Sequence, residues 1–296
     1  MARGDIIASD GLIARNNGPW AKDKLSFIDQ FVPAALQATQ QKLERCYVDL
    51  FAGPGKNVND SVSGEEFDGA ALRALRATSP SARKTHFTKA TLVNLDADDH
   101  AALTARVDAL DQAGALRPRR KNVALLNGDA NHVVHRVMTA IDTRAYVFVF
   151  LDIEAPKQLS WATLQALRMH GHDSVDLFTL FPLDMALNRM LSYRQETVEQ
   201  SASVLTKFFG TDAWRPLLSE RVTDAQSREL RRAILDLYLN RVRALGWKHA
   251  IVVRDVKRVG DSGLYKMIYA SNHPAGHDIA QWSAEQPRRR DQLDMF

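Results

Sequence analysis

The 296-residue sequence predicts an α/β fold in which helices cover both faces of a mostly parallel sheet. Three observations predict it. Segments with helical spacing alternate with short apolar segments through the first 182 residues. Most of these short segments are apolar at every position, which is typical of strands buried on both faces. Two later β-like segments flank VGDSG, which predicts an antiparallel hairpin near the C-terminus.

The expected elements begin with a helix and a strand. Residues 20–45 carry apolar side chains at three- and four-residue spacing and predict a helix, and CYVDLF at 46–51 predicts the first strand. Residues 57–69 are rich in Asn, Ser, Gly and Glu and predict a loop. The elements expected next, in order, are helix 70–77, strand 89–96, helix 98–114, strand 122–129, helix 131–141, strand 145–152, helix 160–170 and strand 174–182.

The pattern changes after residue 182. Residues 183–245 contain only helical patterns, and the two hairpin strands follow. We therefore expect a core of residues 1–182 and 246–285 with a helical insert at 183–245. Residues 286–296 are polar, basic and proline-containing, which predicts a flexible tail.

Composition limits the classes of function. The single cysteine, Cys46, excludes an intramolecular disulfide and any cysteine-based zinc or iron–sulfur site. It fits a reducing, cytoplasmic setting, and the histidines form no metal-binding motif, so we expect no metal. No apolar run could span a bilayer, which predicts no membrane association. The net charge of +4 permits a polyanionic partner without requiring one.

The glycine-rich segment YVDLFAGPGKN, residues 47–57, follows the first predicted strand. A phosphate-binding loop needs Gly-x-x-x-x-Gly-Lys-Ser/Thr, but Leu50 stands at its first position and Asn57 at its last. A dinucleotide loop needs a third glycine where Val58 stands. Both interpretations fail on the residues themselves.

The remaining interpretation is the loop of class I S-adenosylmethionine (SAM) methyltransferases, acid-x-Gly/Phe-x-Gly-x-Gly. Asp49, Phe51, Gly53 and Gly55 match it. The glycines would let the backbone approach the methionine part and the ribose closely. Asp49 would supply a carboxylate near the ligand's ammonium group or its bound water.

Acids also end the next three predicted strands. Asp96 would bind the ribose hydroxyls, Asp129 with Ala130 would bind the adenine, and Asp152 would lie where a substrate meets the methyl group. In open α/β sheets the ligand crevice lies at these carboxyl ends. Acids at four successive strand ends predict a SAM site, although Asp is also a common residue at the end of a strand.

Asp152, Glu154 and Lys157 are the candidate catalytic residues, because they follow the fourth strand at the same rim. Cytosine-C5 methylation would need a Pro-Cys nucleophile there, and Cys46 is elsewhere. Amino-group methylation usually employs Asn/Asp-Pro-Pro-aromatic, which is missing. That chemistry is therefore unsupported rather than excluded.

Five segments together resemble the three-Cys-motif partner proteins (TcmP): WAKDKLSFIDQF, YVDLFAGPG, GDAN, FLD and LYKMIYASNHPAG. The similarity covers about residues 20–282. The resemblance implies a Rossmann-like, class I methyltransferase-like fold. It also implies a radical-SAM-like partner that carries the three-cysteine motif. LDIEAP stands where family members often have LDPFG, which leaves the catalytic geometry at Asp152 open.

The last five residues, QLDMF, resemble the bacterial sliding-clamp-binding pentapeptide Q-L-[SD]-L-F. Leu293, Met295 and Phe296 would fill an apolar groove, and Gln292 would hydrogen-bond at its edge. This predicts the DNA sliding clamp as a second partner and DNA as the substrate. Two hypotheses stay open: a SAM-dependent enzyme of DNA repair or modification, and a non-catalytic adaptor that bridges partner and clamp.

Overall fold

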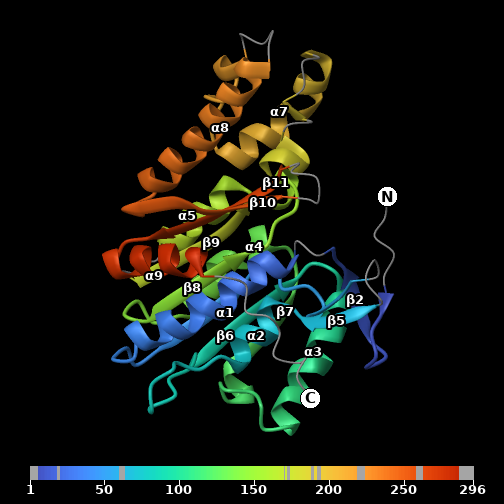
Figure 1. Cartoon of the computed structure of the whole chain (residues 1–296), viewed down its shortest axis with the longest axis vertical. Helices are drawn as coiled ribbons and strands as arrows, with labels where there is room; N and C mark the ends of the chain where they lie inside the picture. Colours follow the sequence, from blue (N-terminus) through green and yellow to red (C-terminus); the bar gives the residue numbers. More distant parts are fainter. Residues whose placement is uncertain are drawn as a thin grey trace.

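The computed structural model describes residues 6–18, 21–59, 64–169, 171, 174–187, 190–191, 195–218, 224–257 and 263–286. Its centre is a seven-stranded sheet (Figure 1). The tail with QLDMF lies outside the described residues. The strands of the sheet are β3 (Arg45–Asp49), β6 (Lys89–Asn94), β7 (Val123–Asn127), β8 (Tyr146–Leu151), β9 (Ser174–Phe181), β10 (His249–Lys257) and β11 (Gly263–Ser271).

The order of these strands defines the fold. It is β10-β11-β9-β8-β3-β6-β7, and β11 pairs antiparallel with both of its neighbours while all other pairs are parallel. The chain runs outward from β3 through β6 to β7, then crosses back to β8 and β9. This is the Rossmann-like order of class I methyltransferases, with a reversed strand from a C-terminal hairpin. The predicted fold class is confirmed.

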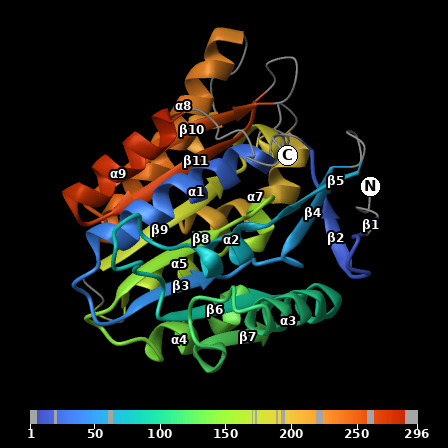
Figure 2. The ribbon, with the colours of Figure 1, turned by 60° about the horizontal axis from the view of Figure 1, so that its bottom comes forward.

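Helices cover both faces of the sheet. Helix α1 packs against α2 and α9 on one face, and α4 packs against α5 on the other (Figure 2). Helices α7 and α8 lie between β9 and β10 in the chain and extend past that edge of the sheet (Figure 1). The helices are α1 (Ala21–Ala38), α2 (Ala70–Arg76), α3 (Ala97–Gln112), α4 (Ala130–Thr139), α5 (Trp161–Met169), α7 (Gln195–Phe209), α8 (Asp224–Ala244) and α9 (Pro274–Glu285).

Aromatic side chains join α1 to the centre of the sheet. Phe27 and Phe31 are one turn apart on α1, with ring centroids 5.3 Å apart. Phe31 contacts Phe148 of β8, and Phe27 stacks on Phe178 of β9. All four rings are fully buried. Their burial holds α1 firmly beside the strand ends that carry the acids.

A second, four-stranded sheet was not predicted. It has the order β1-β2-β4-β5 and consists of β1 (Ile6–Ile7), β2 (Ile13–Asn16), β4 (Lys56–Asn59) and β5 (Glu65–Asp68). The prediction of a loop at 57–69 is therefore wrong over much of its length. These strands are short and polar, and β4 is held by parallel pairing with β2, more than 40 residues away. Sequence periodicity cannot reveal such pairing.

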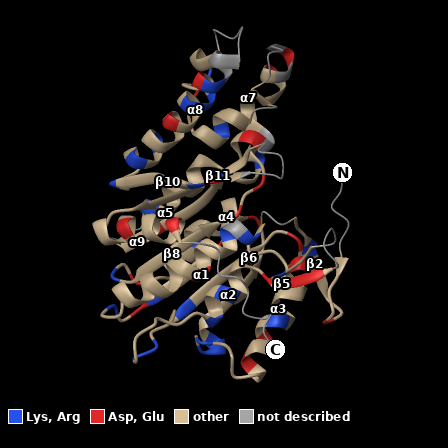
Figure 3. Ribbon diagram, in the orientation of Figure 1, with Lys and Arg blue, Asp and Glu red and all other residues tan. Residues whose placement is uncertain are grey.

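Other features differ less from the prediction. Helix α1 ends at Ala38, before the expected residue 45, and α9 begins at Pro274. Lys and Arg are interspersed with Asp and Glu along α8 and the lower loops in the view of Figure 3. Among the described residues, no helix is both long and apolar enough to cross a membrane.

Candidate functional site

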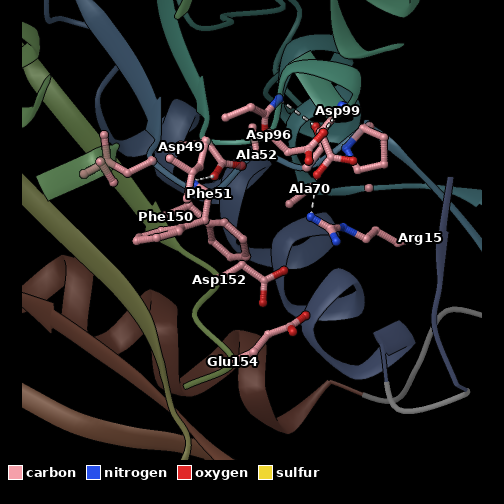
Figure 4. Close-up of a pocket in the computed structure, with 18 of the residues that line it drawn as sticks. Arg15, Asp49, Phe51, Ala52, Ala70, Asp96, Asp99, Phe150, Asp152 and Glu154 are labelled. Carbon is pink, nitrogen blue, oxygen red and sulfur yellow. Dashed lines mark hydrogen bonds and ion pairs between the residues drawn. The ribbon is translucent and has the colours of Figure 1, made fainter. Parts of the chain in front are cut away.

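A cavity of about 570 Å³ opens at the carboxyl ends of β3, β6, β7 and β8 (Figure 4). The structure brings every predicted cofactor and catalytic residue to its wall: Asp49, Phe51, Gly53, Gly55, Asp96, Asp129, Ala130, Asp152, Glu154 and Lys157. These residues are up to 108 positions apart in the chain and come together only because the strands are parallel.

The loop after β3 has a backbone that requires glycine. Gly53 and Gly55 have φ of +61° and +89°, a region that other residues rarely adopt. A Cβ on Gly55 would lie 2.9 Å from Leu103 Cδ1 and would also contact Leu72. Gly55 therefore provides both the left-handed turn and the close approach of α2 and α3 beneath the cavity.

Hydrogen bonds fix this loop to the next strand. Asn94 donates from Nδ2 to the carbonyl oxygen of Gly53 at 3.0 Å, and the Ala52 amide donates to the Val93 carbonyl oxygen at 3.0 Å. The Gly69 amide donates to the Gly55 carbonyl oxygen at 2.7 Å. The loop is thus preorganised at the end of β3.

Asp49 forms the floor of the cavity. Its side chain is buried; Oδ2 accepts from the Tyr47 hydroxyl at 2.9 Å and Oδ1 from the Phe51 amide at 3.1 Å. Burial raises the pKa of Asp49 to about 7, and the nearby Asp152 adds to this effect. The two hydrogen bonds act in the opposite direction and favour the charged form.

Asp96 and Asp129 each cap a helix. Asp96 Oδ1 accepts from the amides of Asp98 and Asp99 at the start of α3, at 2.9 and 3.0 Å. Asp129 Oδ1 accepts from the Asn131 amide at the start of α4, at 2.8 Å. A carboxylate has two oxygens, and in both residues the capping bonds occupy Oδ1. Both side chains nevertheless line the cavity, so capping and ligand binding are compatible.

An apolar surface lies beside these caps. Leu95 is 76% exposed although it is a large aliphatic residue, and it lines the cavity next to Asp96. Ala130, by contrast, is buried behind Asp129. An exposed leucine between two acids is suited to the flat face of a heterocycle whose polar edge meets the carboxylates.

The segment after β8 forms the opposite wall. Asp152 forms an ion pair with Lys24 of α1. The amides of Glu154 and Ala155 both donate to Gln158 Oε1, at 2.6 and 2.9 Å, which closes LDIEAPKQ into a tight turn. The Asp152 and Glu154 carboxylates lie next to each other in Figure 4. Lys157 is exposed at the outer rim.

Several wall residues were not predicted. Arg15 of β2 forms an ion pair with Asp99 of α3, and Asn17 donates to the side chain of Asn57. Lys24 also lines the cavity. The small sheet and α1 bring these residues to the site. Only Lys24 lay within a segment noted in the sequence, WAKDKL, and nothing distinguished it there.

The remaining reactive groups give no alternative site. Burial raises the pKa of the Cys46 thiol to about 12, so it behaves as a core residue. No cluster of three or more His, Cys, Asp or Glu side chains suited to a metal ion occurs among the residues that the structure describes.

The strand order and the cavity define a class I methyltransferase-like fold with a binding site at the usual edge of the sheet. No protein-family model matches the sequence, and no curated protein matches it. The relation to the three-Cys-motif partner proteins therefore remains a prediction.

Solved structures with a similar arrangement have low identity. A Legionella pneumophila protein of family model DUF519 has a TM-score of 0.45 at 10% identity, over 84% of this chain and 85% of that chain. Trm1 from Pyrococcus horikoshii, in complex with SAM, has a TM-score of 0.45 at 12% identity, over 93% and 61%. TYW2 from M. jannaschii, in complex with SAM, has a TM-score of 0.39 at 9% identity, over 89% and 83%.

Proposed function

We propose that the protein binds SAM in this cavity and is a methyltransferase-like enzyme acting in DNA repair or modification. One observation carries the proposal. The glycine loop and four acids from four successive parallel strands line a single cavity. Its volume of about 570 Å³ lies within the range of about 300–1,000 Å³ that is usual for small-molecule sites.

The residues fit the parts of SAM. Gly53 and Gly55 allow close approach of the backbone to the methionine part, and Asp96 keeps a carboxylate oxygen beyond its capping bonds for the ribose. Leu95 and Asp129 suit the face and the amino edge of the adenine. The bound group would supply an electrophilic methyl carbon, and Asp152 and Glu154 lie where its acceptor would enter.

Calorimetry with SAM and S-adenosylhomocysteine tests the cofactor. We expect both to bind to the purified full chain. Gly55→Val, which places bulk against Leu72 and Leu103, should abolish binding, whereas Gly114→Val, far from the cavity, should not. Absence of binding at millimolar ligand would reject the proposed function.

The partners are a further part of the proposal. The tail would recruit the protein to the bacterial sliding clamp through Gln292, Leu293, Met295 and Phe296, and a radical-SAM-like three-Cys-motif protein would act with it. A pull-down with purified clamp tests recruitment. If removal of residues 292–296 leaves clamp binding unchanged, recruitment through the tail is wrong.

The second candidate function is a non-catalytic adaptor. The tight turn that Gln158 closes after Asp152 favours it, because LDIEAP replaces the segment that usually completes an amino-methylation site. An adaptor would bind clamp and partner protein with the same affinity whether or not its cavity binds SAM. Gly55→Val therefore separates the two candidates: an enzyme loses its function in the cell, and an adaptor keeps it.

A further inference from the structure

From the charges around the mouth of this cavity, we infer that the group methylated is an amino nitrogen. This inference rests on the proposed function, because it assumes that SAM places its methyl group beside Asp152. It names the chemical class of the acceptor, which the fold alone does not determine.

The cavity is acidic although the protein is basic. Six carboxylates and four cationic side chains line it. Three of the cations contact carboxylates: Lys24 pairs with Asp152, Arg15 with Asp99, and Lys56 with Asp10 and Glu66. The fourth, Lys157, lies at the exposed rim. The interior therefore offers a negative environment to whatever enters.

This excess is local to the acceptor side. Asp152 and Glu154 are two residues apart in the turn after β8, and both carboxylates point toward the open space of the cavity (Figure 4). The Asp152 side chain is 22% exposed and Lys24 is 12% exposed, so their interaction is shielded from bulk water. Counting Lys24 against them leaves one negative charge at the point where the acceptor must approach.

The sign of this charge discriminates between acceptors. A thiolate or an alkoxide must carry negative charge before it attacks, and two nearby carboxylates oppose that charge. An amino group instead presents N–H donors, and carboxylates are acceptors only. Hydrogen bonds from its N–H groups to Asp152 and Glu154 would orient the nitrogen lone pair toward the methyl carbon.

The transfer balances without another reactant. An N–C bond forms, the S–C bond breaks with its electron pair remaining on sulfur, and the nitrogen releases one proton. The Asp152 or Glu154 carboxylate accepts that proton and passes it to water at the open rim.

Sinefungin tests the inference without a known substrate. It is a SAM analogue in which a carbon bearing an ammonium group replaces the methyl-bearing sulfur, so its charge lies where the acceptor nitrogen would be. S-adenosylhomocysteine is the same scaffold without that group. By calorimetry on the full chain, we expect sinefungin to bind about tenfold more tightly, or about 1.4 kcal/mol.

Variants localise the effect. Glu154→Gln and Asp152→Asn should each reduce the ratio of the two affinities, while Lys24→Met, which removes a positive charge, should increase it. Asp129→Asn, on the adenine side, should weaken both ligands and leave the ratio unchanged. Circular dichroism of each variant verifies folding, and Glu154→Gln is the safer variant because it breaks no ion pair with Lys24.

The outcomes are distinguishable. If neither ligand binds, the proposed function fails and the inference fails with it. If both ligands bind with equal affinity, or S-adenosylhomocysteine binds more tightly, the SAM site stands and the amino acceptor is overturned. A preference for sinefungin that Glu154→Gln and Asp152→Asn leave unchanged would also overturn it, because the selecting charge would then lie elsewhere.

Discussion

Arg106 Nη1, in the middle of α3, donates to the carbonyl oxygen of Pro54 at 2.6 Å, so a buried guanidinium holds the centre of the glycine loop. The same side chain donates to the Ile13 carbonyl oxygen at 2.8 Å and to both Asp10 oxygens at 2.9 and 2.8 Å. These bonds hold the pKa of Asp10 well below its usual range. Arg106 thereby joins the small sheet to the wall of the cavity.

Replacing Arg106 should affect both stability and ligand binding. Arg106→Met leaves the Pro54 and Ile13 carbonyl oxygens and the Asp10 carboxylate without this donor. We expect the free energy of unfolding to fall by about 3 kcal/mol, as when a buried ion pair loses one partner. SAM affinity should fall as well, because the loop loses its anchor. Urea denaturation and calorimetry measure the two effects.

Arg120→Met is the matched control for Arg106→Met. Arg120 also pairs with an aspartate from α3, Asp108, at 2.6 Å, but both side chains are substantially exposed. We expect a loss below about 1 kcal/mol and unchanged SAM affinity. Equal losses for the two variants would show that the Arg106 network does not preorganise the site.

A methyl group at Gly55 should destabilise the fold more than one at an open glycine. Gly55→Ala adds a Cβ 2.9 Å from Leu103 at a φ of +89°, whereas Gly114→Ala meets nothing within 4 Å at a φ of +66°. We expect about 1 kcal/mol for Gly114→Ala from backbone strain alone and about 3 kcal/mol for Gly55→Ala from strain plus overpacking. Thermal denaturation of both variants would reveal the difference. Similar losses would mean that α2 and α3 can shift apart.

The sequence predicted what is encoded locally. Apolar strands such as 145–152 and the acids that end them are recognisable within ten residues. Parallel pairing then brings Asp49, Asp96, Asp129 and Asp152 to one edge. The role of Asp96 and Asp129 as helix caps follows from the same local logic, since a helix begins directly after each of them.

What the sequence did not predict depends on contacts between distant residues. Lys24 and Asp152 are 128 positions apart, and Arg106 and Asp10 are 96 apart. Neither Lys24 nor Arg106 differs from an ordinary surface residue of an amphipathic helix until the other elements are in place. The polar strands β4 and β5 likewise lack the apolar alternation by which strands are recognised.

The buried Asp49 should make stability depend on pH. Its pKa is raised from 3.8 to about 7 in the folded protein, so the folded state binds more protons than the unfolded state between these values. The stability contributed by protonated Asp49 is complete below about pH 4 and is lost as the pH rises through about 7. Relative to Asp49→Asn, the wild type should lose about 4 kcal/mol over this range, which urea denaturation at several pH values measures.

Asp142→Asn provides a comparison of opposite sign. Hydrogen bonds from the Arg144 side chain and amide lower the pKa of Asp142 from 3.8 to about 2. Here the wild type should lose stability relative to the variant as the pH falls from about 4 toward 2. A wild-type advantage over Asp49→Asn that stays constant between pH 4 and pH 8 would contradict the assignment of a raised pKa to Asp49.

Two substitutions at Asp96 separate its structural role from ligand binding. Asparagine caps helices about as well as aspartate, and its Oδ1 can still accept from the amides of Asp98 and Asp99. Asp96→Asn should therefore leave the free energy of unfolding almost unchanged but weaken SAM binding about tenfold, because the charged hydrogen bond to the ribose is lost. Asp96→Ala should lose the same affinity and about 1 kcal/mol of stability. Calorimetry and urea denaturation on both variants give the two numbers independently. If Asp96→Asn binds SAM like the wild type while Asp96→Ala is destabilised, the acid after β6 is only a helix cap, and the strand-end acids lose their value as evidence for the cofactor.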